Sequence, residues 1–291
     1  MPVRNNTVLT ILILSQLIAG STYLVVKLGL REFDPFSLGL LRFLIAGTVF
    51  ALLLKSRKDF RWFEKRDLGR FLVLALLAVP LNQGLFLYGM QYTLASHGAL
   101  LYATTPLQVL GLSIIILGER PTALKVAGIL LGFCGVILVL FDRGLAFARQ
   151  TITGDLFVLG GVITWSLYTI YSKKLLARYR PLEVTGFSLT LGSLLFLPVG
   201  LPFVLRMDIG QVSRTGIFSL FYLAIMTSVV AYLIWSWALS KLEASKVAVI
   251  SNLQPVIAAA LAWVLFKEPV TVKFVLGTAV VLAGVIMAEN G

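Results

Sequence analysis

Apolar residues dominate ten stretches of the chain, and short polar segments separate these stretches. A helix needs about 20 apolar residues to cross the hydrocarbon core of a bilayer, whereas the strands of a membrane barrel are shorter and alternate between apolar and polar residues. The pattern therefore predicts an all-α integral membrane protein with ten transmembrane helices and no room for a soluble domain. The predicted spans are roughly residues 7–30, 36–54, 68–91, 95–117, 122–141, 154–177, 182–205, 214–240, 245–266 and 271–288.

Two of these spans share a pattern of prolines and acidic residues. Pro106 precedes Glu119 by the same number of residues as Pro255 precedes Glu268. Other residues repeat with almost the same spacing: Lys27 and Pro35 recur as Lys173 and Pro181, and Ser96, Gly128 and Gly135 recur as Ser245, Gly277 and Gly284. The chain is therefore predicted to contain two repeats, residues 1–150 and 151–291.

Each predicted repeat contains five spans, which is an odd number. The second repeat must then cross the membrane in the opposite direction from the first. Inverted repeats of this kind are common in secondary transporters, where the substrate site lies near the bilayer midplane between the repeats.

The composition agrees with this interpretation. Only 13% of residues are charged, against roughly 25% in soluble proteins, and the mean hydropathy is +0.94. One cysteine, Cys134, and one histidine, His97, offer no intrachain disulfide and no metal cluster, so we expect no metal and no cofactor. The first apolar stretch is longer than a signal-peptide core and no small-residue cleavage site follows it, so we expect it to be retained.

The net charge of +12 reflects basic residues that lie mostly in the connectors between spans. If the N-terminus is cytoplasmic, the inner segments hold sixteen Lys and Arg residues and the outer segments hold seven. Because cytoplasmic loops carry the excess of basic residues, both termini are predicted to be cytoplasmic, in a multi-pass protein of the cell (inner) membrane. We expect the lipid bilayer and a small molecule as partners, but no nucleic acid and no obligatory protein partner.

The chain resembles the drug/metabolite transporter superfamily, specifically its ten-helix EamA type, over essentially all of residues 7–288. The resemblance rests on Lys27, Arg42, Pro106, the pair Gly118-Glu119, Gly128 and Gly135, and their counterparts in the second half. It implies two tandem five-helix repeats and transport of a small molecule. Similar proteins export aromatic and other amino acids or cysteine metabolites, and relatives carry nucleotide sugars or triose phosphates.

Kinked helices and polar stripes predict the wall of a substrate cavity. A proline inside a helix frees the carbonyl four residues earlier, and in a membrane such groups need protein or water as partners. Polar and aromatic residues on one helix face suit an amphipathic metabolite, although each face has a packing interpretation as well. The predicted lining comprises Gln16, Tyr23, Asn82, Tyr88, Tyr102, Thr104, Gln108, Trp165, Tyr168, Ser228, Tyr232, Trp235, Ser251 and Asn252.

A second group is predicted to serve as gates or as structural supports: Lys27, Arg42, Pro106, Glu119, Lys173, Pro255 and Glu268. The lysines near span ends can instead extend to the membrane surface. For Arg42, internal hydrogen bonding is favoured over substrate binding. The acids at the two helix ends either fix those ends or act in opposite gates. Gly128, Gly132 and Gly135 form a packing face, either for the span of Gly277 and Gly284 or for a second subunit.

We therefore expect a secondary transporter, not an enzyme, that exports amino acids by alternating access, with aromatic amino acids among the candidates. A nucleotide-sugar or sugar-phosphate carrier and a drug efflux protein remain alternatives. A membrane-embedded lipid enzyme would need a nucleophile, carboxylate or metal cluster, which the sequence lacks. No Walker-type phosphate loop is present, so direct ATP drive is not expected. The substrate, the direction, the coupling ion and the oligomeric state stay open.

Overall fold

The computed structural model describes residues 5–59, 62–93, 95–141, 149–266 and 272–291, and within these residues every regular element is helical. The helices are α1 (Asn5–Gly29), α2 (Pro35–Lys55), α3 (Leu68–Leu76), α4 (Asn82–Tyr92), α5 (Ala95–Tyr102), α6 (Thr105–Leu117), α7 (Ala123–Phe141), α8 (Arg149–Leu176), α9 (Pro181–Val204), α10 (Arg214–Tyr222), α11 (Tyr232–Lys241), α12 (Ala244–Val249), α13 (Leu253–Phe266) and α14 (Val272–Asn290). They form ten spans in the described part of the chain, which confirms the predicted fold class.

The observed span boundaries lie close to those predicted from hydropathy. The sixth span differs most, since α8 begins at Arg149 and not near residue 154. Six helical segments are long and apolar enough to cross a bilayer on their own, and shorter apolar helices form the others. The protein is therefore a multi-pass membrane protein.

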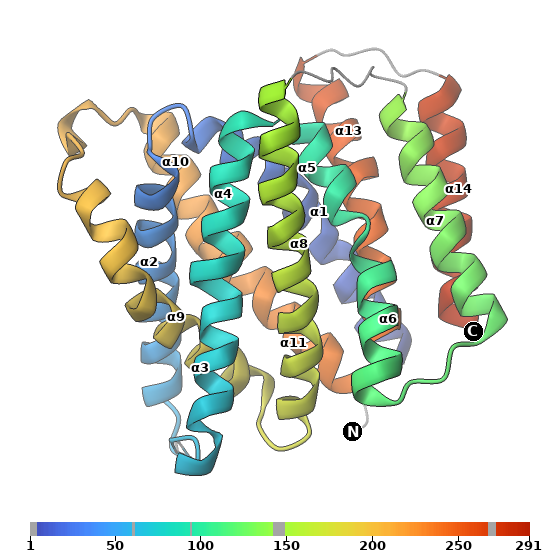
Figure 1. The fold of residues 1–291 in the computed structure, drawn as a ribbon, viewed down its shortest axis with the longest axis horizontal. Coiled ribbons are helices and arrows are strands. Elements are labelled where there is room, and N and C mark those ends of the chain that lie inside the picture. The colour runs from blue at the N-terminus through green and yellow to red at the C-terminus, as the bar shows by residue number, and fades with distance from the viewer. Residues whose placement is uncertain (1–4, 60–61, 94, 142–148, 267–271) are drawn as a thin grey trace.

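The two halves run in opposite directions through the bundle. In Figure 1, α1 rises from Asn5 at the lower end, whereas α8 descends from Arg149 at the upper end. Equivalent spans of the two halves pack side by side, α2 against α9 and α7 against α14. The first span of each half packs against the third and fourth spans of the other half: α1 contacts α10 and α13, and α8 contacts α4 and α6. This pairing is what an inverted repeat predicts.

Glycines allow α7 and α14 to approach closely. A Cβ atom added to Gly128 would lie 2.7 Å from the carbonyl oxygen of Gly284, and one added to Gly135 would lie 2.8 Å from that of Gly277. Only glycine permits this backbone contact. The small-residue face of α7 therefore packs against α14, which resolves the choice that the sequence left open.

Two spans contain π-helical segments at corresponding places in the two halves, η2 (Leu77–Leu81) between α3 and α4, and η4 (Leu223–Ala231) between α10 and α11. Pro80 explains the first, because proline removes a helical hydrogen bond. In the second, the Ser228 hydroxyl donates to the carbonyl oxygen of Leu223 at 3.0 Å and satisfies a group that the widened helix frees.

The prolines of the fourth and ninth spans interrupt their helices. They were predicted to kink continuous helices, but α5 ends at Tyr102 and α6 restarts at Thr105, with Pro106 in its first turn. In the ninth span the 3₁₀ turn η5 (Ile250–Asn252) separates α12 from α13, and Pro255 lies in the first turn of α13. The first turn tolerates proline because its N–H groups have no helical partner.

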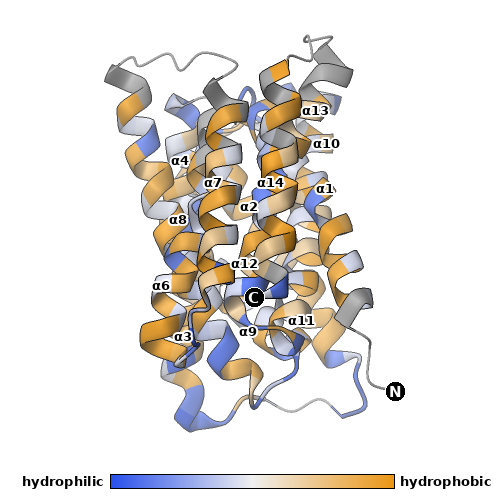
Figure 2. Ribbon diagram, turned by 90° about the vertical axis from the view of Figure 1, so that its right-hand side faces the viewer, coloured by the Kyte–Doolittle hydropathy of each residue, from blue (hydrophilic) through white to orange (hydrophobic). Residues whose placement is uncertain are grey.

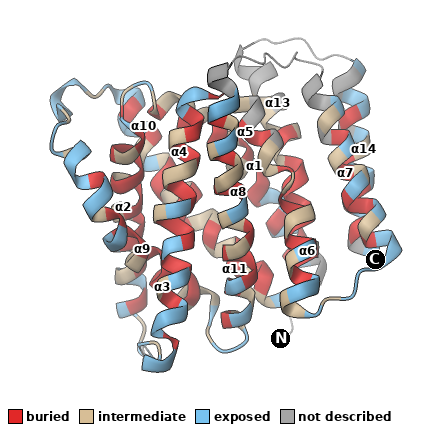
Figure 3. Cartoon of the chain, viewed as in Figure 1, coloured by how far each residue is buried: buried red, intermediate tan, exposed pale blue. Residues whose placement is uncertain are grey.

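The outside of the bundle is apolar, and its interior combines apolar core clusters with buried polar side chains. In Figure 2 the helical ribbons are mostly orange, the colour of hydrophobic residues, along their middle parts. Large side chains such as Ile115 and Ile286 are exposed. Figure 3 shows the buried residues along the inward faces, and these include Gln16, Asn82 and Arg42. Polar groups inside the bundle and apolar groups outside it are the arrangement expected in a bilayer.

Candidate functional site

A cavity of about 100 Å³ lies in the interior, where segments of both halves meet. Its lining comes from α1, α2, α4 and α5 of the first half and from α8, η4, α11 and α13 of the second. A water molecule needs about 10–15 Å³ of such volume, so the space suits a few waters or part of a small ligand. The lining residues are Ser15, Gln16, Ala19, Thr22, Tyr23, Arg42, Asn82, Gln83, Phe86, Tyr102, Trp165, Thr227, Ala231, Tyr232, Trp235 and Gln254.

Arg42 provides the positive charge of the cavity wall. Its side chain is almost fully buried, with 1% exposed. Nε donates to Ser228 Oγ at 2.7 Å and Nη1 donates to Gln83 Oε1 at 3.1 Å, so both partners are neutral. In the described part of the chain no carboxylate pairs with Arg42. The guanidinium therefore remains an uncompensated charge with N–H donors to spare.

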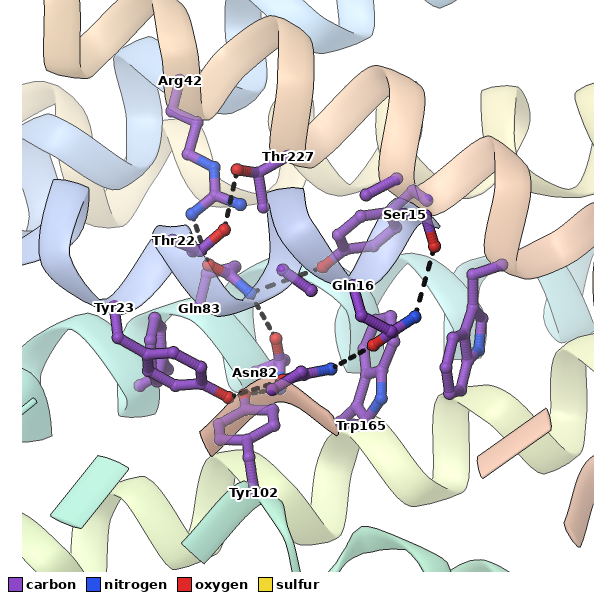
Figure 4. A pocket seen from close by; sticks show the side chains of 16 residues that line it. Ser15, Gln16, Thr22, Tyr23, Arg42, Asn82, Gln83, Tyr102, Trp165 and Thr227 are labelled. Atoms are coloured by element: carbon purple, nitrogen blue, oxygen red, sulfur yellow. Dashed lines mark hydrogen bonds between the residues drawn. The ribbon is translucent and has the colours of Figure 1, made fainter. Parts of the chain in front are cut away.

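Two amides extend the hydrogen bonds of Arg42 across the cavity wall (Figure 4). Gln83 donates through Nε2 to Asn82 Oδ1 and, at 3.4 Å, to Tyr232 OH. Asn82 donates through Nδ2 to the carbonyl oxygen of Gly161 at 2.7 Å and to Tyr102 OH at 3.2 Å. These contacts join α4 to α5, α8 and α11, and they fix which atoms face the cavity.

A second hydrogen-bonded chain joins α1 to the start of α13. Tyr23 OH donates to Gln254 Oε1 at 2.9 Å, and Gln254 Nε2 donates to Gln16 Oε1 at 3.0 Å. Gln16 Nε2 in turn donates to Ser15 Oγ at 3.2 Å. Figure 4 labels Ser15, Gln16 and Tyr23 of this chain. Since Gln254 immediately precedes Pro255, the interrupted ninth span contributes to the wall in the first turn of its second helix.

Aromatic rings complete the cavity. The Trp165 ring centroid lies 5.1 Å from that of Tyr232 and 5.4 Å from that of Trp235. On the other side, Tyr102 packs edge-on to Tyr23 with centroids 6.0 Å apart. The buried Trp235 Nε1 has no hydrogen-bond partner. The wall therefore offers flat apolar surfaces, and the indole N–H of Trp235 lies beneath them.

The structure brings seven of the predicted lining residues to the cavity: Gln16, Tyr23, Asn82, Tyr102, Trp165, Tyr232 and Trp235. Seven others lie elsewhere: Tyr88, Thr104, Gln108, Tyr168, Ser228, Ser251 and Asn252. Arg42, which the sequence assigned to a structural role, makes the internal hydrogen bonds expected of it and lines the cavity as well.

The predicted residues that do not line the cavity make contacts elsewhere, and these contacts explain their positions. Tyr88 packs against Phe157, with centroids 4.8 Å apart. Tyr168 stacks behind Trp165, and Ser228 lies behind Arg42, which it orients.

The four remaining residues, Thr104, Gln108, Ser251 and Asn252, are held away from the cavity by hydrogen bonds or by packing. Gln108 accepts from Ser166 Oγ at 3.2 Å and donates to Thr104 Oγ1 at 3.2 Å, and Ser251 donates to the carbonyl oxygen of Ala248 at 2.6 Å. Asn252 is fully buried beside Gly132, and neither polar atom of its amide has a partner.

Sequence reasoning did not select Thr22, Gln83, Thr227 and Gln254. Their hydroxyls and amides interact within the wall, for example Thr22 Oγ1 with Thr227 Oγ1 at 3.0 Å. Gln83 and Gln254 each lie within three residues of a proline inside a span. A search for amides next to such prolines would have found both.

The two predicted gating lysines occupy equivalent positions in the halves, outside the cavity wall. Lys27 Nζ donates to the carbonyl oxygen of Met90 at 2.5 Å, near the end of α4. Lys173 Nζ donates to the carbonyl oxygens of Leu239 and Leu242, both at 2.6 Å, at the end of α11. A cation stabilises the free carbonyls at a helix C-terminus, so each lysine fixes the end of its half's third span.

Glu119 joins the two halves at the lower end of the bundle. Its Oε1 accepts from the backbone N–H of Ala244 at 2.8 Å and its Oε2 accepts from Ser245 Oγ at 2.6 Å, at the start of α12. Nearby, Lys125 Nζ lies 2.5 Å from Glu243 Oε2, and this hydrogen bond lowers the pKa of the Glu243 carboxyl. Glu268, the predicted counterpart of Glu119, lies outside the described residues.

Comparisons with known proteins give a consistent result. A family described as "EamA-like transporter family" matches residues 6–141 and again residues 152–289. An "Uncharacterized transporter" of Archaeoglobus fulgidus is 30% identical over 91% of this chain and 92% of its own length. The "Uncharacterized transporter YetK" of Bacillus subtilis is 31% identical over 92% of this chain and 82% of its own length. A solved structure titled "Crystal structure of protein" shares the fold, with a TM-score of 0.79 at 19% identity, over 97% of this chain and 98% of that one.

Proposed function

The chain belongs to the EamA-like transporter family, and on this premise we propose that it is a secondary transporter that exports amino acids or related small metabolites across the cell (inner) membrane. The observation that carries the proposal is the cavity lined by both halves of an inverted repeat. Such a site is reached alternately from the two sides when one half rocks against the other.

The chemistry of the wall supports a small amphipathic substrate. Trp165, Trp235 and Tyr232 present apolar ring surface, while Arg42 and the amides of Gln16 and Gln83 present polar groups. Ligand sites commonly combine a mostly apolar wall with a few fixed polar groups in this way. An aromatic amino acid matches both features, since its ring and its polar end are separated.

The interactions at the helix ends suit gates on the two sides. The Lys173 and Glu119 contacts lie at the lower end of the bundle, and the Lys27 contact lies at the opposite end. In alternating access one set of end contacts must open while the other holds. The excess of basic residues in the lower connectors supports a cytoplasmic lower end.

A carrier for sugar phosphates or nucleotide sugars is less well supported. It would need several cations in the cavity, and of the eligible residues Lys27, Arg42, Lys173 and Lys246 only Arg42 lines the wall. Competition of transport by phosphate esters would distinguish this alternative.

Flux through proteoliposomes tests the proposal. Vesicles with purified protein are loaded with radiolabelled amino acids, and efflux is compared with that of protein-free vesicles, with and without a proton ionophore. We expect protein-dependent efflux of at least one amino acid, and aromatic ones are tested first. The absence of such flux for every amino acid would remove the amino-acid proposal.

A further inference from the structure

The cavity wall carries one more positive charge than negative charge. Arg42 lines it, and no aspartate or glutamate does so among the described residues. The guanidinium has five N–H donors, of which Ser228 and Gln83 accept from two. Burial of an ion without a counter-charge is costly, so an arginine held in this way is stabilised by an anion that enters the cavity.

The hydrogen-bonding groups of the wall show the same imbalance. The carbonyl oxygens of the Gln16, Gln83 and Gln254 side chains already accept hydrogen bonds from neighbours. By contrast, Arg42 donates through Nε and Nη1 only and keeps spare N–H groups. Such a wall receives a ligand that accepts hydrogen bonds, and it lacks the carboxylate that a substrate ammonium group would need.

The positions of the rings indicate what the rest of the ligand must be. Trp165 packs against Tyr232 and Trp235, and these rings line the same cavity as Arg42. A flat apolar group therefore fits beside the rings while its charged end reaches the guanidinium. Because a single cation is present, a singly charged carboxylate balances the site better than a doubly charged phosphate.

We propose that the preferred substrate is an aromatic carboxylate with a net negative charge, held by Arg42, and that a substrate amino group weakens binding. This inference rests on the proposed function and, within its substrate class, favours related metabolites without an amino group over the amino acids themselves. A guanidinium and a carboxylate form two parallel hydrogen bonds, which fixes the orientation of the ligand as well as its charge.

A series of four compounds with one phenyl ring tests the charge preference. Calorimetric binding to purified protein in lipid nanodiscs is measured for 3-phenylpropionate (anion), phenylalanine (zwitterion), phenethylamine (cation) and phenyl phosphate (dianion). We expect 3-phenylpropionate to bind at least tenfold more tightly than phenylalanine, and phenethylamine not to bind. Phenyl phosphate should bind less tightly than the carboxylate. Tighter binding of phenyl phosphate, equal binding across the series, or binding of none would overturn the proposal.

Variants then assign the preference to Arg42. Arg42→Gln should abolish the advantage of 3-phenylpropionate over phenylalanine, whereas Arg42→Lys should retain part of it because the charge remains. Arg42→Lys also provides the readout if Arg42→Gln fails to fold, because an ammonium group cannot form the two parallel hydrogen bonds of a guanidinium. An undiminished preference in a folded Arg42→Gln variant, or in Arg42→Lys if that is the variant that folds, would contradict the assignment.

The outcomes separate this inference from the proposed function. Protein-dependent flux of phenylalanine without any preference for the anion would leave a transporter and refute the charge argument. Tight, Arg42-dependent binding of the anion without flux of any compound would support the charge argument and refute transport.

Discussion

Removal of the Glu119 carboxylate should destabilise the protein, because this side chain satisfies two donors at the start of α12 from the other half. Loss of a helix N-cap costs about 0.5–2 kcal/mol, and hydrogen bonds to a charged group contribute about 1.5–3 kcal/mol when buried. Glu119 is partly exposed, so both values must be reduced for solvent. We expect Glu119→Ala to cost about 1–2 kcal/mol, which corresponds to a fall in Tm of about 2–5 °C for a chain of this size.

Thermal unfolding in detergent, followed by tryptophan fluorescence, measures this effect. A double-mutant cycle with Ser245→Ala provides the control, since Ser245 Oγ donates to Glu119 Oε2. The two single changes should remove the same hydrogen bond, so their effects should fall short of additivity by at least about 0.5 kcal/mol. A Tm of Glu119→Ala equal to that of the wild type, or strictly additive effects, would refute the reasoning.

Three further changes test packing, charge and buried polarity by thermal unfolding. Gly128→Ala should cost about 1–3 kcal/mol, because its Cβ would meet the backbone of α14, whereas Gly111→Ala, with open space around it, should not destabilise. The Lys125 hydrogen bond keeps the pKa of Glu243 below its ordinary value of 4.5, so the pair's contribution to stability is present at neutral pH and lost as the pH falls through that lowered pKa. The Tm difference between wild type and Glu243→Gln should therefore shrink below pH 4.5, and a constant difference would contradict this. Asn252→Leu should raise Tm, since the buried amide has no partner and an unsatisfied group costs about 1–3 kcal/mol; a fall in Tm would contradict this expectation.

The spans and the inverted repeat could be predicted from the sequence because both appear as patterns along the chain. A bilayer requires about 20 apolar residues per helix, so hydropathy alone located each span to within a few residues. The repeated spacing from Pro106 to Glu119 and from Pro255 to Glu268 fixed the relation between the halves. The interruption of the helices was harder to predict, because a proline in a span is compatible with either a kink or a restart.

The cavity lining could be predicted only in part. Helical periodicity gives the face on which a residue lies, but not which neighbour covers that face. Asn252, at mid-span, was an attractive candidate, yet it is buried beside Gly132 of α7. Arg42 Nε donates to Ser228, which lies in the π-helical segment η4, and the sequence of η4 contains no proline to signal that distortion.

Transport by a variant with a filled cavity is the most direct test of the account. Ala231 lines the cavity, and Ala231→Trp should occupy it, whereas Leu194→Trp places the same ring on the exposed, lipid-facing surface. In proteoliposomes, wild type and Leu194→Trp should carry substrate at similar rates, and Ala231→Trp should lose flux while its melting behaviour shows that it is folded. Equal flux through folded Ala231→Trp would contradict the claim that substrate passes through this cavity.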